Sequence, residues 1–413
     1  MHTKLASFVA WSTSQGITTS LQLVVENSYR YMTLPSDDSQ LFEEVGSSES
    51  VNLVSVPLDA CIVADDSQAL AERLIHEKSL GEDSKYAPWL DMFPSLDDFQ
   101  GMPRFWAPER LELVQKFDGG QLADRMKFDQ LRFDKIDDQW ALAVVDSRSN
   151  FLPDGTYSIS PMLDMFNHDS TIPTSATVEN ERLILDVSPK AFLVPDEVPD
   201  EVPDEPAQEE EKPDWKEQMF GMFRGPTSSG SDAKSSSDAK SSSDTKSSSD
   251  AKSSNRKRKG SEIFISYGDL NNLECLCNYG FVPDNNGCNT ETFQVRMMRQ
   301  SPATIVVDDT GSMENMFNQL TLSSLRLNLA TIDELEELKM YSQGSKISEK
   351  NELEVYALIG GELEEAVYEA KKGIKEAEEV NDALAAAYLE GRRSTLQKAA
   401  ERLQRKYPEI YGI

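Results

Sequence analysis

The chain is poor in the residues on which several common chemistries depend. Its 413 residues include only four cysteines and three histidines, which is too few for a disulfide framework and gives no metal-ligand spacing of histidines. No apolar run approaches the roughly 18 residues of a transmembrane helix. The sequence also lacks a phosphate loop, a dinucleotide fingerprint and a nucleophile elbow. These absences argue against disulfide-stapled, membrane-spanning, nucleotide-dependent and hydrolase classes.

Positive charge is scarce as well. Lysine and arginine number 41 against 72 acidic residues, which gives a net charge of −31. Binding to a phosphate backbone needs clustered cations, so this composition argues against nucleic acid and favours a basic, lysine-presenting protein surface as the partner. Residues 1–11 lack the apolar core of a signal peptide and the character of a transit peptide. We expect a soluble monomer of the cytoplasm or nucleus, with no membrane partner.

Hydrophobic patterns divide the chain into strand-rich and helix-rich parts. Residues 1–63 are typical of strands and turns because they contain β-branched runs. Residues 65–135 carry helical signals, among them Pro108 as the first residue of a helix. Another helix is expected at 140–145, and extended chain follows over 157–187. The mixture predicts an α+β protein.

The composition changes abruptly in the middle of the chain. Residues 194–205 repeat Val-Pro-Asp-Glu, and a Ser-Ser-Ser-Asp-Ala-Lys repeat then runs to Lys252. Such sequence buries too little apolar surface to offset the entropy of ordering, so residues 192–258 are predicted to be a disordered acidic and Ser-rich insert. A tolerated surface insertion is the simpler explanation, and a phosphorylated or partner-binding tether is the alternative. The basic run 255–259 fits either a nuclear localisation signal or a solvated end of the insert.

Helical patterns dominate the last part of the chain. Thr331 and Glu334 have the spacing of a capping box at the start of a helix. Apolar residues then recur at helical spacing through Val367 and on to Leu396, between acidic faces that are typical of solvated surface. We therefore predict a helical C-terminal part.

Two distant groups of residues suggest a chemistry. Residues 262–268, Glu-Ile-Phe-Ile-Ser-Tyr-Gly, alternate like a strand that ends at a phenol, and residues 279–281, Tyr-Gly-Phe, follow a short helical segment. Far upstream, residues 147–150, Ser-Arg-Ser-Asn, lead to residues 164–168, Asp-Met-Phe-Asn-His. Together these segments resemble the SET-domain protein methyltransferases, in the branch whose founding members act on Rubisco and other non-histone proteins.

This resemblance implies a fold, a cofactor and a reaction. The fold is α+β: a SET (β-clip) domain of small β-sheets over residues 1–287, with residues 65–135 as an inserted helical subdomain. An all-α substrate-binding-like domain follows over residues 288–413, where 348–352 and 391–393 resemble landmarks of that domain. The cofactor implied is S-adenosylmethionine, and the reaction is N-methylation of a lysine in a non-histone protein without a metal.

The resemblance also assigns roles to residues. Tyr267 matches the catalytic tyrosine; taken alone it would be an ordinary strand tyrosine. The residues that match cofactor-binding positions are Arg148, Asn167, His168 and Tyr279. The residues that match positions near the substrate amine are Ser147, Asn150 and Asp164. Without the resemblance, Arg148 would be expected to form an ordinary surface ion pair.

The chemistry of methyl transfer suits a tyrosine at this place. The sulfonium donor already carries a positive leaving group, so the site must hold a neutral amine in line with the methyl group at about 3–3.5 Å. Free lysine titrates near 10.4, and desolvation beside a like charge lowers the pKa of an amine. A phenol hydroxyl can orient the amine through its oxygen lone pairs without adding a full charge.

The cysteines and one acidic turn allow other interpretations. Cys275, Cys277 and Cys288 invite a zinc site, but no fourth cysteine or histidine lies near them, so packing of the thiols inside a helix is favoured. Residues 284–287, Asp-Asn-Asn-Gly, resemble a calcium loop but lack its spaced acids, so a turn is expected.

The chain departs from the family pattern at two places. Family members carry an early Gly-x-Gly turn that approaches the cofactor, whereas here no glycine lies between Gly16 and Gly46, and Arg30 occupies the equivalent stretch. This departure keeps a catalytically inactive binding protein as an alternative. At Asn150 most of the branch has an aromatic residue. An asparagine there resembles the actin-histidine methyltransferase and makes histidine an alternative target, because an amide can select the reactive tautomer of an imidazole.

Overall fold

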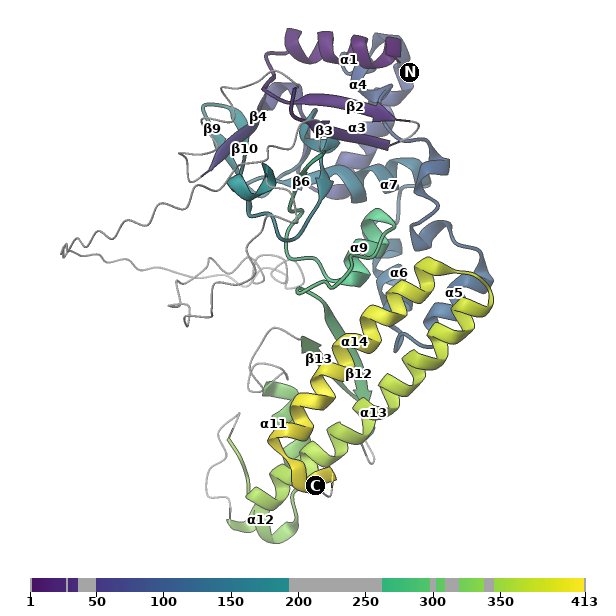
Figure 1. Ribbon diagram of the computed structural model, residues 1–413, viewed down its shortest axis with the longest axis vertical. Helices are drawn as coiled ribbons and strands as arrows, with labels where there is room; N and C mark the ends of the chain where they lie inside the picture. The colour runs from purple at the N-terminus through teal and green to yellow at the C-terminus, as the bar shows by residue number, and fades with distance from the viewer. Residues whose placement is uncertain are drawn as a thin grey trace, which may run out of the picture. The chain divides into compact units, whose positions relative to one another are not determined.

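The computed structural model describes residues 2–26, 29–35, 50–192, 262–297, 302–308, 319–337 and 345–411. These residues form small sheets combined with helices (Figure 1), which agrees with the predicted α+β class. The predicted insert at 192–258 lies outside the described residues except for Phe192, and the basic run at 255–259 also lies outside them. Among the described helices, none is both long and apolar enough to cross a membrane.

Three small sheets build the part of the chain that contains the candidate site. The first has the spatial order β1 (Thr18–Thr19), β4 (Val51–Pro57), β10 (Arg182–Val187) and β9 (Thr174–Glu179). The second has the order β2 (Gln22–Glu26), β3 (Tyr29–Thr33), β11 (Glu262–Ile265) and β8 (Asn167–His168). The third has the order β5 (Ile62–Ala64), β7 (Tyr157–Ile159) and β6 (Ser149–Phe151). Strands are short, so each sheet depends on its neighbours for a core.

Helices occupy the region where the sequence predicts them. The inserted helical region contains α3 (Ser67–Ser79), α4 (Ala87–Leu90), α5 (Pro108–Gln115) and α6 (Gln121–Arg132), and α7 (Gln139–Arg148) follows it. Pro108 is the first residue of its helix, as predicted, because its missing N–H costs nothing there. Consecutive residues from Trp140 to Asp146 are buried, so α7 is a core helix surrounded by other elements.

The prediction of only strands and turns over residues 1–63 is wrong at its beginning. Residues His2–Ser14 form the helix α1. Phe8 is fully buried, and Trp11 stacks on Trp89 with ring centroids 6.1 Å apart. Phe8 and Trp11 lie three positions apart, which places them on one face of the helix, and the packing of this face stabilises α1.

The C-terminal region is mainly helical, as expected, but the prediction that residues 288–413 are all-α is wrong, because they also contain a β-hairpin. Its helices are α11 (Gln319–Leu329), α12 (Ile332–Glu337), α13 (Glu349–Glu379) and α14 (Ala383–Lys406); the last two lie side by side (Figure 1). The capping box is confirmed, because Thr331 and Glu334 exchange backbone-to-side-chain hydrogen bonds. The hairpin pairs β12 (Thr290–Val295) with β13 (Ala303–Asp308). Alternate residues of both strands, Phe293, Val295, Ile305 and Val307, are buried against the helices.

Candidate active site

Strand β11 brings the two predicted groups of residues together. It pairs in parallel with β8, so that Phe264 lies opposite Asn167 and Ile265 opposite His168. Its other edge pairs antiparallel with β3, with Ile263 opposite Met32. Tyr267 lies two residues after the end of β11, and its backbone N–H donates to Nδ1 of His168 at 3.0 Å. Residues a hundred positions apart in sequence therefore share one hydrogen-bonded site.

Aromatic rings form a wall around Tyr267. Its ring stacks on His168 with centroids 5.0 Å apart and lies 4.8 Å from the ring of Tyr279. Phe281 extends the wall, 6.0 Å from Tyr279 and 6.1 Å from His168. The Tyr267 hydroxyl donates its proton to the carbonyl oxygen of Phe166 at 2.5 Å. Burial raises the pKa of Tyr267, so the phenol stays neutral and its oxygen lone pairs can accept from a substrate.

Asn167 is held inside the protein by its amide hydrogens. Its Nδ2 donates to the carbonyl oxygen of Arg30 at 3.0 Å and to Oε1 of Glu262 at 2.6 Å. Glu262 also accepts from the hydroxyl of Tyr29 at 2.9 Å. Because the amide hydrogens are used by protein acceptors, Oδ1 is the remaining polar atom of this side chain. Asn167 could use both its amide donor and its amide acceptor for a ligand only if one of these Nδ2 hydrogen bonds were broken.

Arg148 and Asp164 form a buried ion pair beside the phenol. The Arg148 Nη1 atom lies 3.1 Å from Oδ2 of Asp164, whose side chain is fully buried. Trp89 Nε1 donates to the same oxygen at 3.2 Å. Burial raises the pKa of Asp164, against the opposing effect of Arg148. Among the described residues, Nε of Arg148 and Oδ1 of Asp164 have no hydrogen-bond partner, so the pair keeps a buried donor and acceptor for a ligand.

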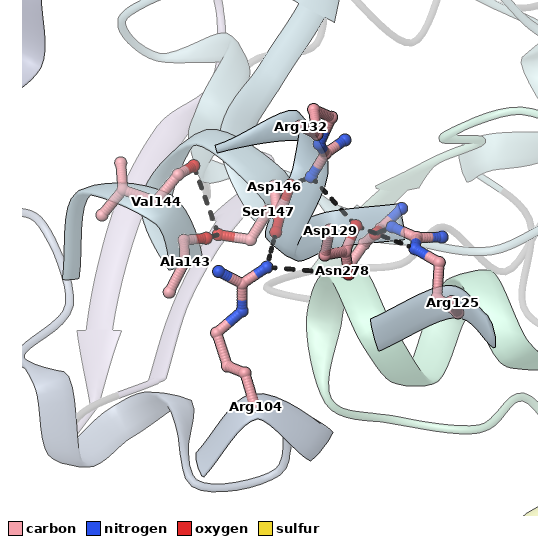
Figure 2. Close-up of polar contacts among 9 residues, drawn as sticks. All are labelled: Arg104, Arg125, Asp129, Arg132, Ala143, Val144, Asp146, Ser147 and Asn278. Atoms are coloured by element: carbon pink, nitrogen blue, oxygen red, sulfur yellow. Dashed lines mark hydrogen bonds and ion pairs between the residues drawn. The ribbon is translucent and has the colours of Figure 1, made fainter. Parts of the chain in front are cut away.

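A charged cluster fixes the helix that carries Ser147 and Arg148 (Figure 2). Asp146, one residue earlier on α7, accepts from both Arg104 and Arg132. Asp129 of α6 accepts from Nε of Arg125 at 3.0 Å, and Arg125 also donates to Oδ1 of Asn278 at 2.5 Å, next to Tyr279. The cluster therefore ties α7 to α9 (Asn272–Tyr279), the helix that places the second phenol.

Ser147 and Asn150 differ in how they are used inside the protein. The hydroxyl of Ser147 donates back to the carbonyl oxygen of Ala143 at 2.7 Å, so it is engaged within its own helix (Figure 2). Asn150 lies on β6, and its Nδ2 is buried with no partner among the described residues. A buried amide donor left unpaired is costly, which makes Asn150 the stronger candidate for contact with a substrate.

Two glycines allow the end of α9 to lie close to the inserted helical region. Gly280 is the C-cap of α9 and has a left-handed conformation, with φ of 77°. A Cβ atom at Gly280 would lie 2.8 Å from the carbonyl carbon of Gly101. This approach fixes the position of Tyr279 and Phe281, so Tyr-Gly-Phe is a packing motif as well as an aromatic one.

The cysteines lie where thiols pack. Cys275 and Cys277 are buried on α9, and burial raises the pKa of each thiol to about 12. Cys288 is partly exposed. In the described part of the chain, no group of three or more histidine, cysteine, aspartate or glutamate side chains is arranged to hold a metal ion.

Comparisons with known proteins connect this geometry to a fold. No protein-family model and no curated protein sequence matches the chain. Among solved structures, the SET domain of LSMT bound to lysine and AdoHcy matches with a TM-score of 0.63 at 15% identity, over 100% of this chain and 93% of that one. Rubisco LSMT bound to AdoMet matches with a TM-score of 0.61 at 15% identity, over 99% and 93%. The chain has the SET-domain fold.

A further match agrees with this result. Rubisco LSMT bound to sinefungin and monomethyllysine has a TM-score of 0.62 at 14% identity and covers 99% of this chain and 93% of that one. The predicted α+β SET fold is thereby confirmed.

Several residues of the SET-domain site were not predicted from the sequence. Phe166 supplies the acceptor for the Tyr267 hydroxyl, Asp146 fixes α7, and Trp89 donates to Asp164. The acceptor at Phe166 is a backbone carbonyl, which every residue has, so the residue type gives no sign of this role. Asp146 could have been found, because it is an acidic residue that directly continues the apolar run of a core helix, and such a charge needs a partner.

The position of His168 leads to a prediction about pH. Burial lowers the pKa of His168 from its ordinary value of 6.5, and its Nδ1 lone pair accepts the N–H of Tyr267, a bond that a protonated ring would lose. The folded state therefore binds this proton less readily than the unfolded state. The stability that neutral His168 contributes is complete above about pH 6.5 and is lost as the pH falls below it.

NMR can measure this titration directly. The chain has only three histidines, so the Cε1–H signal of His168 can be assigned by its absence in His168→Gln. We expect its titration midpoint to lie below 6.5, the ordinary value for histidine. A midpoint at or above that value would show that the imidazole is not held neutral by the site.

Proposed function

We propose that this protein is an S-adenosylmethionine-dependent methyltransferase that methylates a lysine of a folded, non-histone protein. The supporting observation is the meeting of Tyr267 with Asn167 and His168 at the β8–β11 pair, within a fold shared with LSMT structures that bind AdoMet and methyllysine. The net charge of −31 favours a substrate with a basic, lysine-presenting surface.

The residues present suit the donor. The buried Nε of Arg148 is available to the methionine carboxylate, for which a guanidinium offers several donors. The resemblance assigns Asn167 and His168 to the adenine, and Oδ1 of Asn167 and the ring of His168, which stacks on Tyr267, are the groups that they could offer to it. The bound donor supplies an electrophilic methyl group on a sulfonium. The aromatic wall of Tyr267, Tyr279 and Phe281 keeps water from the path between that methyl group and the amine.

The chain's own groups then select the neutral amine. Because the Tyr267 proton is directed to Phe166, the phenol oxygen presents lone pairs to an amine N–H and so orients the nitrogen lone pair away from itself. Desolvation by the aromatic wall lowers the pKa of the amine, which raises the fraction of the nucleophilic form. The ion pair with Arg148 offsets the negative charge of Asp164 and so weakens its tendency to keep the amine protonated.

Binding and transfer test this proposal in sequence. Isothermal titration calorimetry with S-adenosylhomocysteine should detect binding, and radiolabelled S-adenosylmethionine should then label a protein in a lysate. Mass spectrometry of the labelled protein should find methyllysine. If the folded protein bound no S-adenosylhomocysteine, it would be a catalytically inactive SET-fold binding protein.

A histidine acceptor is the second candidate, because Nδ2 of Asn150 is buried with no partner among the described residues, so this side-chain amide is available to a substrate ring. Where the oxygen of that amide accepts the N–H of an imidazole, the other ring nitrogen is left unprotonated and nucleophilic. Methylhistidine in the labelled product would favour this reaction over the lysine reaction. Loss of labelling in Asn150→Ala together with retention of S-adenosylhomocysteine binding would support it further.

A further inference from the structure

Arg30 lies in the candidate cofactor site at the stretch where the family carries a glycine turn. It belongs to β3, whose neighbour in the sheet is β11. Its carbonyl oxygen accepts from Asn167 at 3.0 Å, so its backbone is fixed beside a residue of the site. The larger side chain at this place did not move β3 away from β11, since the pairing of Ile263 with Met32 is intact.

The side chain of Arg30 reaches Phe93. Its Nη2 atom lies 3.5 Å from the carbonyl oxygen of that residue, a long hydrogen bond. The guanidinium of Arg148 lies 5.7 Å from the centre of the ring of the same Phe93. Phe93 therefore marks a place where two guanidinium groups converge, one from β3 and one from the end of α7.

Two positive charges lie close together at this place. Arg148 is ion-paired with the buried Asp164 at 3.1 Å, and the charge of Asp164 also acts on Arg30. Asp98 also acts on Arg30, but it is exposed and accepts from the N–H and hydroxyl of Ser95. Burial and then the charge of Arg148 lower the pKa of Arg30, as expected for two cations held close together. An anion that binds between them would relieve this repulsion.

We propose that Arg30 is a second carboxylate-binding residue, which together with Arg148 holds the carboxylate of an amino-acid ligand. This inference rests on the proposed function and identifies the ligand group as the α-carboxylate of the methionine part of the donor. The guanidinium then replaces the close backbone approach that a glycine turn would provide, because it reaches the carboxylate with its own donors. Ligands with this carboxylate are consequently favoured over the same nucleoside without it.

Calorimetry with two ligands separates this role from a structural one. S-Adenosylhomocysteine has the carboxylate, and 5′-methylthioadenosine has the same nucleoside and thioether without it. We expect Arg30→Met to weaken S-adenosylhomocysteine binding by about tenfold or more and to leave 5′-methylthioadenosine binding unchanged. Arg30→Lys, which keeps the charge, should recover part of the loss. Arg405→Met, at an exposed arginine of α14, should behave like the wild type with both ligands.

Other outcomes would overturn the inference. Equal weakening of both ligands by Arg30→Met would show that Arg30 only supports the fold, and tighter binding of S-adenosylhomocysteine by Arg30→Gly would show that the side chain obstructs the site. Wild-type binding of S-adenosylhomocysteine upholds the proposed function in either case. A wild-type protein that binds neither ligand would end the proposed function and the role of Arg30 with it.

Discussion

Replacing Tyr267 by phenylalanine is expected to lower the rate of methyl transfer by about 10²–10³-fold, the usual effect of removing one oriented polar group from a transition state. The substitution deletes only the hydroxyl. The ring remains stacked on His168 and Tyr279, so the binding of S-adenosylhomocysteine should be nearly unchanged. Loss of the bond to Phe166 should cost about 1 kcal/mol of stability. Single-turnover transfer from labelled S-adenosylmethionine measures the rate, and calorimetry measures binding.

A matched control exists in the same chain. Tyr388 of α14 is fully buried, and its hydroxyl has no hydrogen-bond partner among the described residues. Tyr388→Phe removes the same group from a buried tyrosine outside the site and should leave transfer unchanged. If Tyr267→Phe labelled the substrate as fast as the wild type, the phenol would have no role in catalysis. If it lost ligand binding as well, Tyr267 would be a structural residue of the pocket.

The individual strand and helix of this site could be predicted from the sequence, but the way in which they come together could not. Alternation over residues 262–265 predicts a strand, and Asn271 and Glu274 form a capping box at the start of α9. The parallel pairing of β8 with β11 could not be predicted from local sequence. It joins residues nearly a hundred positions apart, and β8 has only two residues, too few for any periodic pattern. Only the resemblance to SET domains predicted that meeting.

Other features depend on partners that no local pattern reveals. The side chain of Arg30 contacts the carbonyl oxygen of Phe93, which lies on a loop of the inserted helical region. Helix α1 forms because Trp11 finds Trp89 to stack on. The hairpin β12–β13 does have alternating apolar residues, but the helical character of its surroundings obscures them. Tertiary burial decides in each case, as is usual for short elements with weak intrinsic propensity.

Replacing Arg392 by methionine is expected to destabilise the protein by about 3–5 kcal/mol, because it leaves a buried carboxylate without its cation. Arg392 on α14 and Glu291 on β12 each have a side chain only 2% exposed, with Nη1 and Oε2 2.8 Å apart. Nη1 also donates to the carbonyl oxygen of Thr292 at 2.9 Å. These contacts give a physical reason for the Gly-Arg-Arg landmark at residues 391–393. Its first arginine attaches the long helix α14 to the β12–β13 hairpin, which was not predicted.

The neighbouring arginine provides the control. Arg393 pairs with Glu390, whose side chain is 50% exposed, so Arg393→Met should cost less than about 1 kcal/mol. The double substitution Glu291→Gln with Arg392→Met should recover much of the loss, since the buried carboxylate of Glu291 is then removed together with its cation. Urea unfolding followed by circular dichroism measures all three free energies. Equal effects of Arg392→Met and Arg393→Met would contradict the role of burial. Because the ion pair lies outside the aromatic wall, any fall in methyl transfer should follow the fraction unfolded.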